Sequence, residues 1–207
     1  MVSNFKKIRM LVIRLVIFVF IFSSTLNAQT KVNEFNAEGK RIGVWEKYYD
    51  NGSLRYKGQF ENGKEVGVFK FYNEDAPEHP IIIKEFIAHS TIAKVMFYLK
   101  DGTLQSTGEL VGKNRVGKWI FYYENGIKSS EENYVKGQLS GPYKLFYENG
   151  VLAEFTHFEE GEREGKASYY NLKGALLGSG AFSNDEKIGE WEYFEEGDPS
   201  KRSVGKY

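Results

Sequence analysis

The sequence repeats itself every 24 residues, and this period limits the possible folds more than any other feature. Residues 117–126 (GKWIFYYENG) are followed 24 residues later by residues 141–150 (GPYKLFYENG). Units begin near residues 43, 67, 93, 117, 141, 165 and 189; the second has 26 residues and the last looks incomplete. Residues 33–42 read as the second half of an earlier unit. A period of this length is typical of repeat architectures, in which each unit buries its apolar face against its neighbours.

Each unit has the pattern of a β-hairpin. A large apolar residue lies two positions after the opening glycine, then come aromatic residues, a turn, a second strand with a large apolar end, and another turn. In the fourth unit these features are Trp119, Tyr122-Tyr123, Asn125-Gly126, Tyr134 and Lys136-Gly137. Asn-Gly tolerates positive φ at both centres of a tight turn, which makes it a strong hairpin signal. We therefore predict an all-β domain over residues 29–207, with tandem 24-residue hairpins forming one elongated antiparallel sheet.

These motifs resemble the MORN-repeat variant found in the YwqK-type antitoxin family. The resemblance rests on Gly117-Lys118-Trp119, residues 121–126 and the pair Tyr134 and Gly137, and it extends from about residue 33 to residue 198. It implies an elongated antiparallel sheet that serves as an interaction or lipid-associated module. For an antitoxin it implies a toxin partner in the cytoplasm. It places no catalytic residue on this sequence.

The first 28 residues have a different composition. Lys6, Lys7 and Arg9 precede an apolar run at residues 11–22, and small or polar residues follow up to Ala28. This order is typical of a secretory signal peptide. We expect cleavage after Ala28 and an exported protein in the periplasm, at the cell surface or in the medium. The alternative is an uncleaved membrane anchor, although Arg14 interrupts the apolar run.

Charge and cysteine content exclude several classes of partner and stabilising bond. The sequence has no cysteine, so packing and not disulfides must stabilise the fold. Basic and acidic side chains number 28 each, and the predicted signal peptide holds four basic ones and no acidic one. The remaining chain is therefore net negative. This balance argues against nucleic acid as the partner, and it leaves membrane association only weakly supported.

The sequence shows no arrangement that predicts an enzyme. The three histidines, His79, His89 and His157, are not at metal-ligand spacing, so we expect no metal and no cofactor. Acidic pairs such as Glu131-Glu132 and Glu159-Glu160 lie at or near predicted turns, where solvated charges are the simpler interpretation. Neither a nucleophile elbow nor a phosphate-binding loop is present.

Adjacent aromatic residues supply the first candidate binding surface. Successive side chains on a strand point to opposite faces of the sheet, so only one ring of each pair enters the core. The pairs are Tyr48-Tyr49, Tyr122-Tyr123 and Tyr169-Tyr170. The outer rings either pack under Lys and Glu stems of the next strand or form a platform for a protein or an envelope glycan. Aromatic-rich glycine repeats also resemble cell-wall-binding modules that bind choline or glucans.

The second candidate is a loop in the second unit. Residues 73–80 replace the Asn-Gly turn and contain Pro77, His79 and Pro80. Proline cannot donate to a strand ladder, so a longer loop is predicted, either a decayed turn or a ligand-facing loop. The sequence as a whole predicts an exported, non-enzymatic protein-interaction or scaffolding module. The alternatives are a carbohydrate-binding or envelope-binding surface and a YwqK-like antitoxin, with an enzyme of glycan metabolism behind these.

Overall fold

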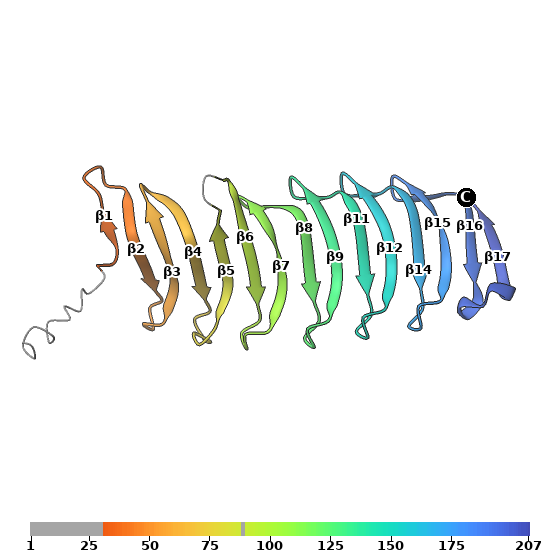
Figure 1. The fold of residues 1–207 in the computed structure, drawn as a ribbon, viewed down its shortest axis with the longest axis horizontal. Coiled ribbons are helices and arrows are strands. Elements are labelled where there is room, and N and C mark those ends of the chain that lie inside the picture. Colours follow the sequence, from red (N-terminus) through yellow and green to blue (C-terminus); the bar gives the residue numbers. More distant parts are fainter. Residues whose placement is uncertain (1–30, 88–89) are drawn as a thin grey trace, which may run out of the picture. The chain divides into compact units, whose positions relative to one another are not determined.

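A computed structural model describes residues 31–87 and 90–207. The predicted signal peptide and its cleavage site lie outside the described residues. From Val32 to Tyr207 the chain forms one unit built on a single 17-stranded antiparallel sheet (Figure 1). The predicted all-β fold with consecutive hairpins in one long sheet is confirmed.

The strands follow one another in chain order. They are β1 (Glu34–Phe35), β2 (Arg41–Tyr48), β3 (Leu54–Glu61), β4 (Lys64–Tyr72), β5 (Pro80–Phe86), β6 (Ile92–Tyr98), β7 (Leu104–Val111), β8 (Asn114–Tyr122), β9 (Lys128–Val135), β10 (Gln138–Leu139), β11 (Gly141–Phe146), β12 (Leu152–Glu159), β13 (Glu162–Arg163), β14 (Gly165–Tyr170), β15 (Leu176–Ser183), β16 (Glu186–Phe194) and β17 (Arg202–Lys206). Two short 3-10 helices, η1 (Glu195–Gly197) and η2 (Pro199–Lys201), connect the last two strands.

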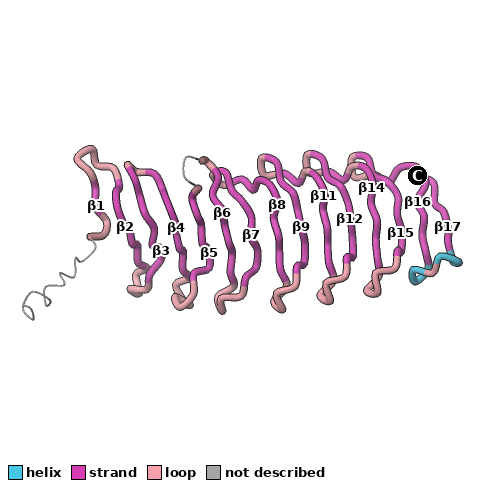
Figure 2. The backbone as a smooth tube through the Cα atoms, viewed as in Figure 1, coloured by secondary structure: helices cyan, strands magenta, loops and turns pink. Residues whose placement is uncertain are grey.

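Apart from the short β10 and β13, each strand pairs with the strands next to it in the chain, so every 24-residue unit is one hairpin beside the next. Within units, pairs such as β2 with β3 and β8 with β9 form the hairpins. Between units, pairs such as β3 with β4 and β7 with β8 join them. β10 and β13 are short segments that precede β11 and β14 and pair with β9 and β12. The turns consequently gather along the two edges of the sheet (Figure 2).

We call these edges the first-turn edge, which carries the Asn-Gly turns, and the second-turn edge. At the second-turn edge, pairs such as Asn62-Gly63 and Lys136-Gly137 have positive φ at both residues. In the Asn-Gly turns of the first-turn edge only the glycine does, as at Gly126, where φ is 81°. The Asn-Gly turns are therefore one residue wider than the tightest hairpin turn. The Asn125 side chain closes the wider turn, because its Oδ1 accepts the backbone N–H of Ile127 at 3.0 Å.

The last unit forms a full hairpin, although its sequence predicts an incomplete one. β16 pairs with β17 along five residues on each strand, from Glu190 opposite Lys206 to Phe194 opposite Arg202. The connection through η1 and η2 replaces the Asn-Gly turn, which is why the repeat pattern is lost there. The Asp198 side chain accepts the backbone N–H of Ser200 at 2.9 Å and caps the second 3-10 helix.

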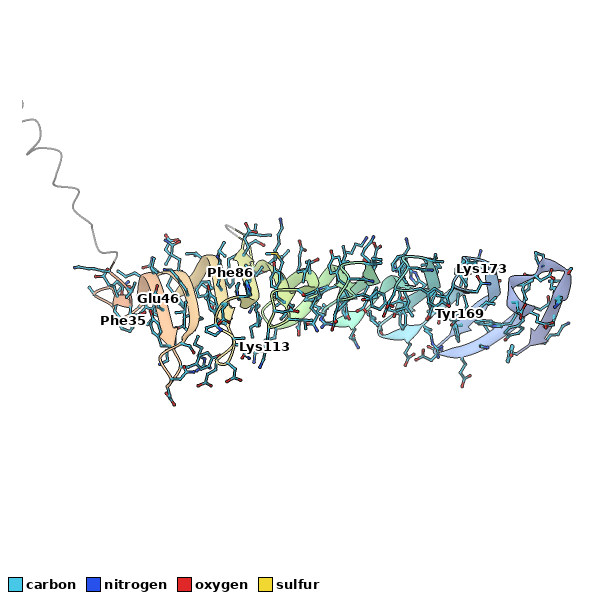
Figure 3. The ribbon with its side chains drawn as sticks, turned by 90° about the horizontal axis from the view of Figure 1, so that it is seen from below. Phe35, Glu46, Phe86, Lys113, Tyr169 and Lys173 are labelled. Carbon is cyan, nitrogen blue, oxygen red and sulfur yellow. The ribbon has the colours of Figure 1, made fainter. Side chains whose placement is uncertain are left out.

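The sheet builds its core from its own side chains, because no second layer of backbone covers either face of the described part (Figure 3). We call the face that carries Phe69, Trp119 and Trp191 the core face and the opposite one the outer face. These three rings are at most 1% exposed. Two buried clusters form on the core face, one around Trp119 and one around Trp191. A buried aromatic contributes about 2–3 kcal/mol, so these rings are the main stabilising elements.

Each of these rings lies over a glycine of the preceding unit. A methyl group added at Gly58 would lie 2.2 Å from the Phe69 ring, and one at Gly108 would lie 2.2 Å from the Trp119 ring. Gly180 has the same relation to Trp191, at 2.3 Å. In all three places the strand pairing is irregular at the glycine. The missing side chain and the local irregularity together make room for the ring.

Where the ring is replaced by a smaller residue, the glycine is replaced by a larger one. Val95 pairs directly with Lys84, and this pair of strands has no irregularity, in keeping with Ala93 where other units open with glycine. Ala167 and Thr156 occupy the positions that Trp119 and Gly108 hold 48 residues earlier, and both are buried. The residue at the ring position and the residue at the glycine position therefore fill a similar volume together, and the units differ in how that volume is divided between the two residues.

On the core face, cationic side chains cover the sides of the core rings that would otherwise meet solvent. The Arg115 guanidinium carbon lies 4.6 Å from the centre of the Trp119 ring, and its Nη1 donates to the Tyr134 hydroxyl at 2.9 Å. The Lys187 ammonium lies 4.4 Å from the Trp191 ring. Arg41 and Arg163 cover Trp45 and Phe182 in the same way, from two residues before the opening glycine. Cation–π contacts thus replace the missing second layer.

Candidate interaction surface

One aromatic ring from every unit lies on the outer face, five residues after the unit's first residue. The seven residues, which we call the outer aromatic row, are Tyr48, Tyr72, Tyr98, Tyr122, Phe146, Tyr170 and Phe194. Each ends the first strand of its hairpin. Since neighbouring strands lie about 4.8 Å apart, successive rings of the row repeat at roughly 10 Å along the sheet.

Contacts on the outer face hold these rings in place. The Tyr48 hydroxyl donates to Glu46 Oε2 at 2.6 Å, and Lys57 binds Glu46 at 2.8 Å. The Lys128 ammonium lies 5.6 Å from the Phe146 ring. Tyr48 is 50% exposed and the other six rings are half-buried. Long Lys and Glu side chains therefore pack beside the row and leave the rings partly accessible.

The sequence-predicted tyrosine pairs have two different arrangements. In the pairs at 48–49 and 122–123 the first ring belongs to the outer aromatic row. The second ring, Tyr49 or Tyr123, reaches the next unit: its hydroxyl donates to the carbonyl oxygen of Tyr72 at 2.9 Å or of Phe146 at 2.6 Å. Tyr147 does the same to the carbonyl of Tyr170 at 2.8 Å. These hydroxyls tie neighbouring hairpins together.

The third pair is one residue out of phase. Tyr169 lies on the core face, stacked with its centre 6.2 Å from that of Trp191, and burial raises the pKa of its hydroxyl. Tyr170 is the member of the outer aromatic row. Tyr72, Tyr98 and the two phenylalanines of the row are not part of adjacent tyrosine pairs, so the pair pattern does not identify them. Their common signal is the fixed distance of five residues from the start of each unit.

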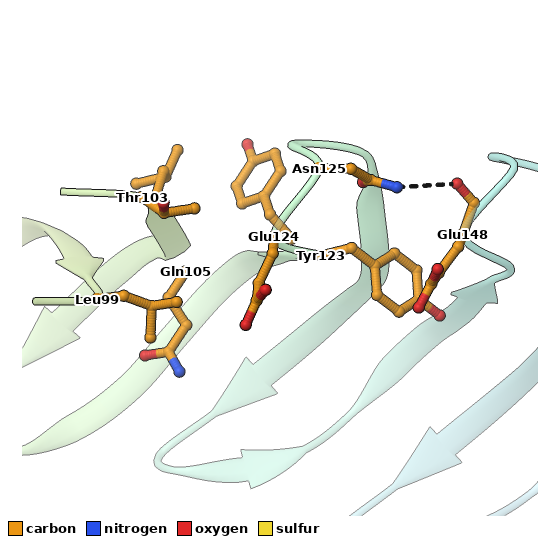
Figure 4. Close-up of a pocket in the computed structure, with 9 residues that line it drawn as sticks. Leu99, Thr103, Gln105, Tyr123, Glu124, Asn125 and Glu148 are labelled. Carbon is orange, nitrogen blue, oxygen red and sulfur yellow. Dashed lines mark hydrogen bonds between the residues drawn. The ribbon is translucent and has the colours of Figure 1, made fainter. Parts of the chain in front are cut away.

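The Asn-Gly turns form a second set of bonds between units. The side-chain amides of Asn51, Asn125 and Asn149 donate to the carbonyls of Glu74, Glu148 and Leu172, at 3.4, 3.4 and 3.0 Å. Every one of these bonds joins residues 23 apart, as do those of the tyrosine hydroxyls. Figure 4 shows the bond from Asn125 to Glu148. Each of these asparagines therefore stabilises two turns: its Oδ1 accepts a bond within its own turn, and its side-chain N–H donates to the turn of the next unit.

The predicted loop at residues 73–80 takes the place of a turn at the first-turn edge. Asn51 and Ser53 donate to the Glu74 carbonyl on one side. On the other side Asp75 lies 3.6 Å from Lys100, and the His79 ring lies beside Gly102. Pro80 is half-buried as the first residue of β5, whereas Pro77 and His79 are exposed. The loop belongs to the second unit, whereas the tyrosine pairs at 122–123 and 169–170 belong to the fourth and sixth units, so the structure does not bring the loop beside them.

Replacing residues 73–80 by the six-residue turn of the fourth unit (YENGIK) is expected to keep the fold and to raise the free energy of unfolding. A shorter connection costs less closure entropy, and the new tyrosine and asparagine can donate to the third unit. Chemical denaturation monitored by circular dichroism measures the effect. Lys100→Met is the control for loss of the Asp75 ion pair, since exposed pairs contribute at most about 1 kcal/mol. A lower unfolding midpoint for the graft would show that the loop stabilises the sheet.

The most strongly perturbed carboxyl also lies on the outer face. Glu131 accepts a bond from Lys118 at 2.8 Å and another from Lys128 at 2.6 Å. These two bonds lower the pKa of Glu131 to about 2. Its side chain is only 12% exposed, so the pair of lysines has little competition from water. The site is an ion-pair network that fixes the position of Lys128 against the outer aromatic row.

The pH dependence of stability follows from the sign of this shift. A lowered pKa in the folded state stabilises the protein at pH values above the ordinary carboxyl pKa, and this contribution is lost as the pH falls toward about 2. We expect Lys118→Met to raise the pKa of Glu131, measured by NMR titration of its carboxyl carbon. Lys113→Met, at an exposed turn lysine, is the control. An unchanged Glu131 pKa in Lys118→Met would contradict this account.

Among residues 31–87 and 90–207, no three His, Asp or Glu side chains gather as they would to hold a metal ion. His157 is exposed on β12. Nor does any helix in the described part have the length and apolarity needed to cross a membrane.

The comparison with protein families agrees with the hairpin architecture. A family described as MORN repeat variant matches residues 41–62, 115–136 and 139–162, which correspond to the first, fourth and fifth units. No curated protein matches the chain. Strand pairing extends the same hairpin to the units between and beyond the matches. Three family matches within seven consecutive hairpins support a MORN-repeat protein.

Proposed function

We propose that this protein is exported and acts as a non-enzymatic interaction or scaffolding module that contacts a partner protein through its outer aromatic row. The observation that carries the proposal is the repetition of one partly accessible ring per unit on the face opposite the core. MORN repeats are commonly protein or membrane interaction modules, which fits this role. Rigid tyrosine rings give large contact areas at low entropic cost, so a fixed row of them suits protein binding.

The proposal is tested by capture of partners from the cell-envelope fraction. The test variant combines Tyr48→Ser, Tyr72→Ser and Tyr170→Ser, three members of the row. The matched control combines Val111→Ser and Val135→Ser, two exposed apolar residues at the second-turn edge. We expect the wild type and the control to retain the same partner and the triple variant to lose it. Equal capture by a folded triple variant would contradict the role of the row.

An envelope glycan is the alternative ligand, because sugar rings also stack on exposed tyrosines. A glycan array with the wild type and the same triple variant distinguishes the two: row-dependent glycan binding would favour the sugar. The finer resemblance to YwqK-type antitoxins predicts a cytoplasmic partner instead. N-terminal sequencing of the protein from the cytoplasmic and envelope fractions of its host decides between these locations. Export with cleavage predicts a chain outside the cytoplasm that begins at Gln29, and a cytoplasmic chain that begins at Met1 would contradict it.

A further inference from the structure

The junction between the third and fourth units lacks both kinds of bond that tie the turns of other units together. At the position of Tyr49, Tyr123 and Tyr147 the third unit has Leu99, and at the position of the turn asparagine it has Asp101. Leucine has no polar group and an ionised aspartate only accepts hydrogen bonds, so neither side chain can donate one. Across the described residues, no side chain donates to the carbonyl oxygens of Tyr122 and Glu124, which are the equivalent acceptors.

A pocket of about 500 Å³ lies at this junction. Leu99, Thr103 and Gln105 line one side of it, and Glu124 lies across from them (Figure 4). Tyr122 also lines the pocket. Its size is within the range of small-ligand and side-chain sites. The pocket is located where a tyrosine at position 99 would extend toward the next hairpin. The shorter Leu99 side chain therefore leaves part of this space open.

The chain itself shows which group fits such a place. At three other junctions a phenol ring fills it, and the hydroxyl donates to the carbonyl at 2.6–2.9 Å. In the first unit Arg55 covers the ring of Tyr49, with the guanidinium carbon 5.6 Å from the ring centre. Gln105 occupies the same position in the third unit as Arg55 in the first, and it lines the pocket.

We propose that this pocket binds a tyrosine side chain of the partner protein, whose hydroxyl donates to the carbonyl oxygen of Tyr122. The inference rests on the proposed interaction role and specifies the chemistry of one contact. The partner tyrosine replaces the missing internal one and restores a bond that three other junctions make within the chain. The ring gains apolar contact with Leu99, and the Tyr122 carbonyl oxygen gains the side-chain donor that it lacks.

Charge at the rim defines the surroundings of this tyrosine. Glu124 and Glu148 line the pocket and are exposed, so the rim is negative. A phosphate on the partner tyrosine would meet two carboxylates and a carbonyl oxygen, and it would lack the hydroxyl donor. The pocket therefore selects an unmodified tyrosine, preferably beside a basic residue. Phosphorylation of that tyrosine would release the partner.

The test is an NMR titration of the full chain with three short peptides: acetyl-Gly-Tyr-Lys-amide and its phenylalanine and phosphotyrosine counterparts. We expect the tyrosine peptide to shift the methyl signals of Leu99, Thr103 and Leu104 saturably. The phenylalanine peptide should bind about two- to tenfold more weakly, the usual effect of one net hydrogen bond. The phosphotyrosine peptide should give no saturable shift. Absence of shifts with the tyrosine peptide, or equal affinity for all three, would overturn the proposal.

Two variants test the position of the ring. Leu99→Tyr should fill the pocket with an internal tyrosine and abolish peptide binding. Leu172→Tyr, at an exposed turn leucine of the same edge, should leave it unchanged. Peptide binding that persists in folded Leu99→Tyr would contradict the assignment. Partner capture from the cell-envelope fraction separates the tyrosine pocket from the proposed role of the outer aromatic row. If the wild type captures its partner but does not bind the tyrosine peptide, only the tyrosine pocket is overturned. Capture retained by the Tyr48, Tyr72 and Tyr170 triple variant, which leaves the pocket intact, overturns only the outer aromatic row.

Discussion

Trp119→Ala is expected to lower the free energy of unfolding by roughly 3–5 kcal/mol, the range for emptying a buried aromatic site. Trp119 is fully buried at the centre of the larger core cluster. Its ring contacts Phe97, Phe121 and Tyr134, and its indole N–H donates to the Glu109 carbonyl at 3.1 Å. Removal of the ring therefore leaves a cavity between two units and an acceptor without its donor.

Denaturant midpoints measured by circular dichroism test this expectation, with Glu124→Ala as the control. Glu124 is exposed at the first-turn edge, and its replacement should change stability by at most about 0.5 kcal/mol. Stability in a stack of repeats is close to a sum of neighbouring contacts. Hydrogen exchange should therefore increase most in the third and fourth units. Similar midpoints for the two variants would mean that the buried positions of the repeat are assigned wrongly.

Gly108→Thr is the second large change, with an expected loss of at least about 2 kcal/mol, because any Cβ at this position overlaps the Trp119 ring. Away from such a ring, replacing a strand glycine would stabilise the sheet by about 0.5–1 kcal/mol. Gln105→Thr, at an exposed position of the same strand, is the control and should have little effect.

The double variant Gly108→Thr with Trp119→Ala tests the exchange of volume between units. It recreates the combination that the chain uses naturally at Thr156 and Ala167. We therefore expect it to be more stable than the sum of the two single changes predicts, with a favourable coupling on the order of 1–3 kcal/mol. Additive losses would show that the glycine and the ring are independent.

The hairpin architecture was predictable because its determinants are local. The spacing of Trp119, Asn125-Gly126 and Tyr134 within one unit gives the strand, turn and strand without knowledge of any neighbour. The pairing of Gly108 with Trp119 was not predictable in the same way. It depends on strand register between units, and a glycine inside a strand gives no sign of the side chain that lies over it.

In the candidate surfaces, too, the features set within one strand are predictable and those that depend on a neighbouring unit are not. Alternation along a strand predicts that only one ring of the pair Tyr122-Tyr123 enters the core, but it does not reveal that Tyr123 donates to the next unit. Without that bond, Leu99 and Asp101 look like ordinary variation in a repeat. Their importance becomes visible only when three equivalent tyrosines are seen to reach equivalent carbonyls, because the pocket is defined by the group that is missing.

The constant separation of 23 residues in the hydroxyl–carbonyl bonds also governs how such a chain can change in length during evolution. Loss of residues 141–164 would bring Tyr123 beside Tyr170, whose carbonyl already accepts a tyrosine hydroxyl from Tyr147. Loss of half a unit would place a turn against a strand and leave the hydroxyl without an acceptor. Gene duplication and deletion are therefore tolerated in steps of one hairpin, and each step adds or removes one outer ring.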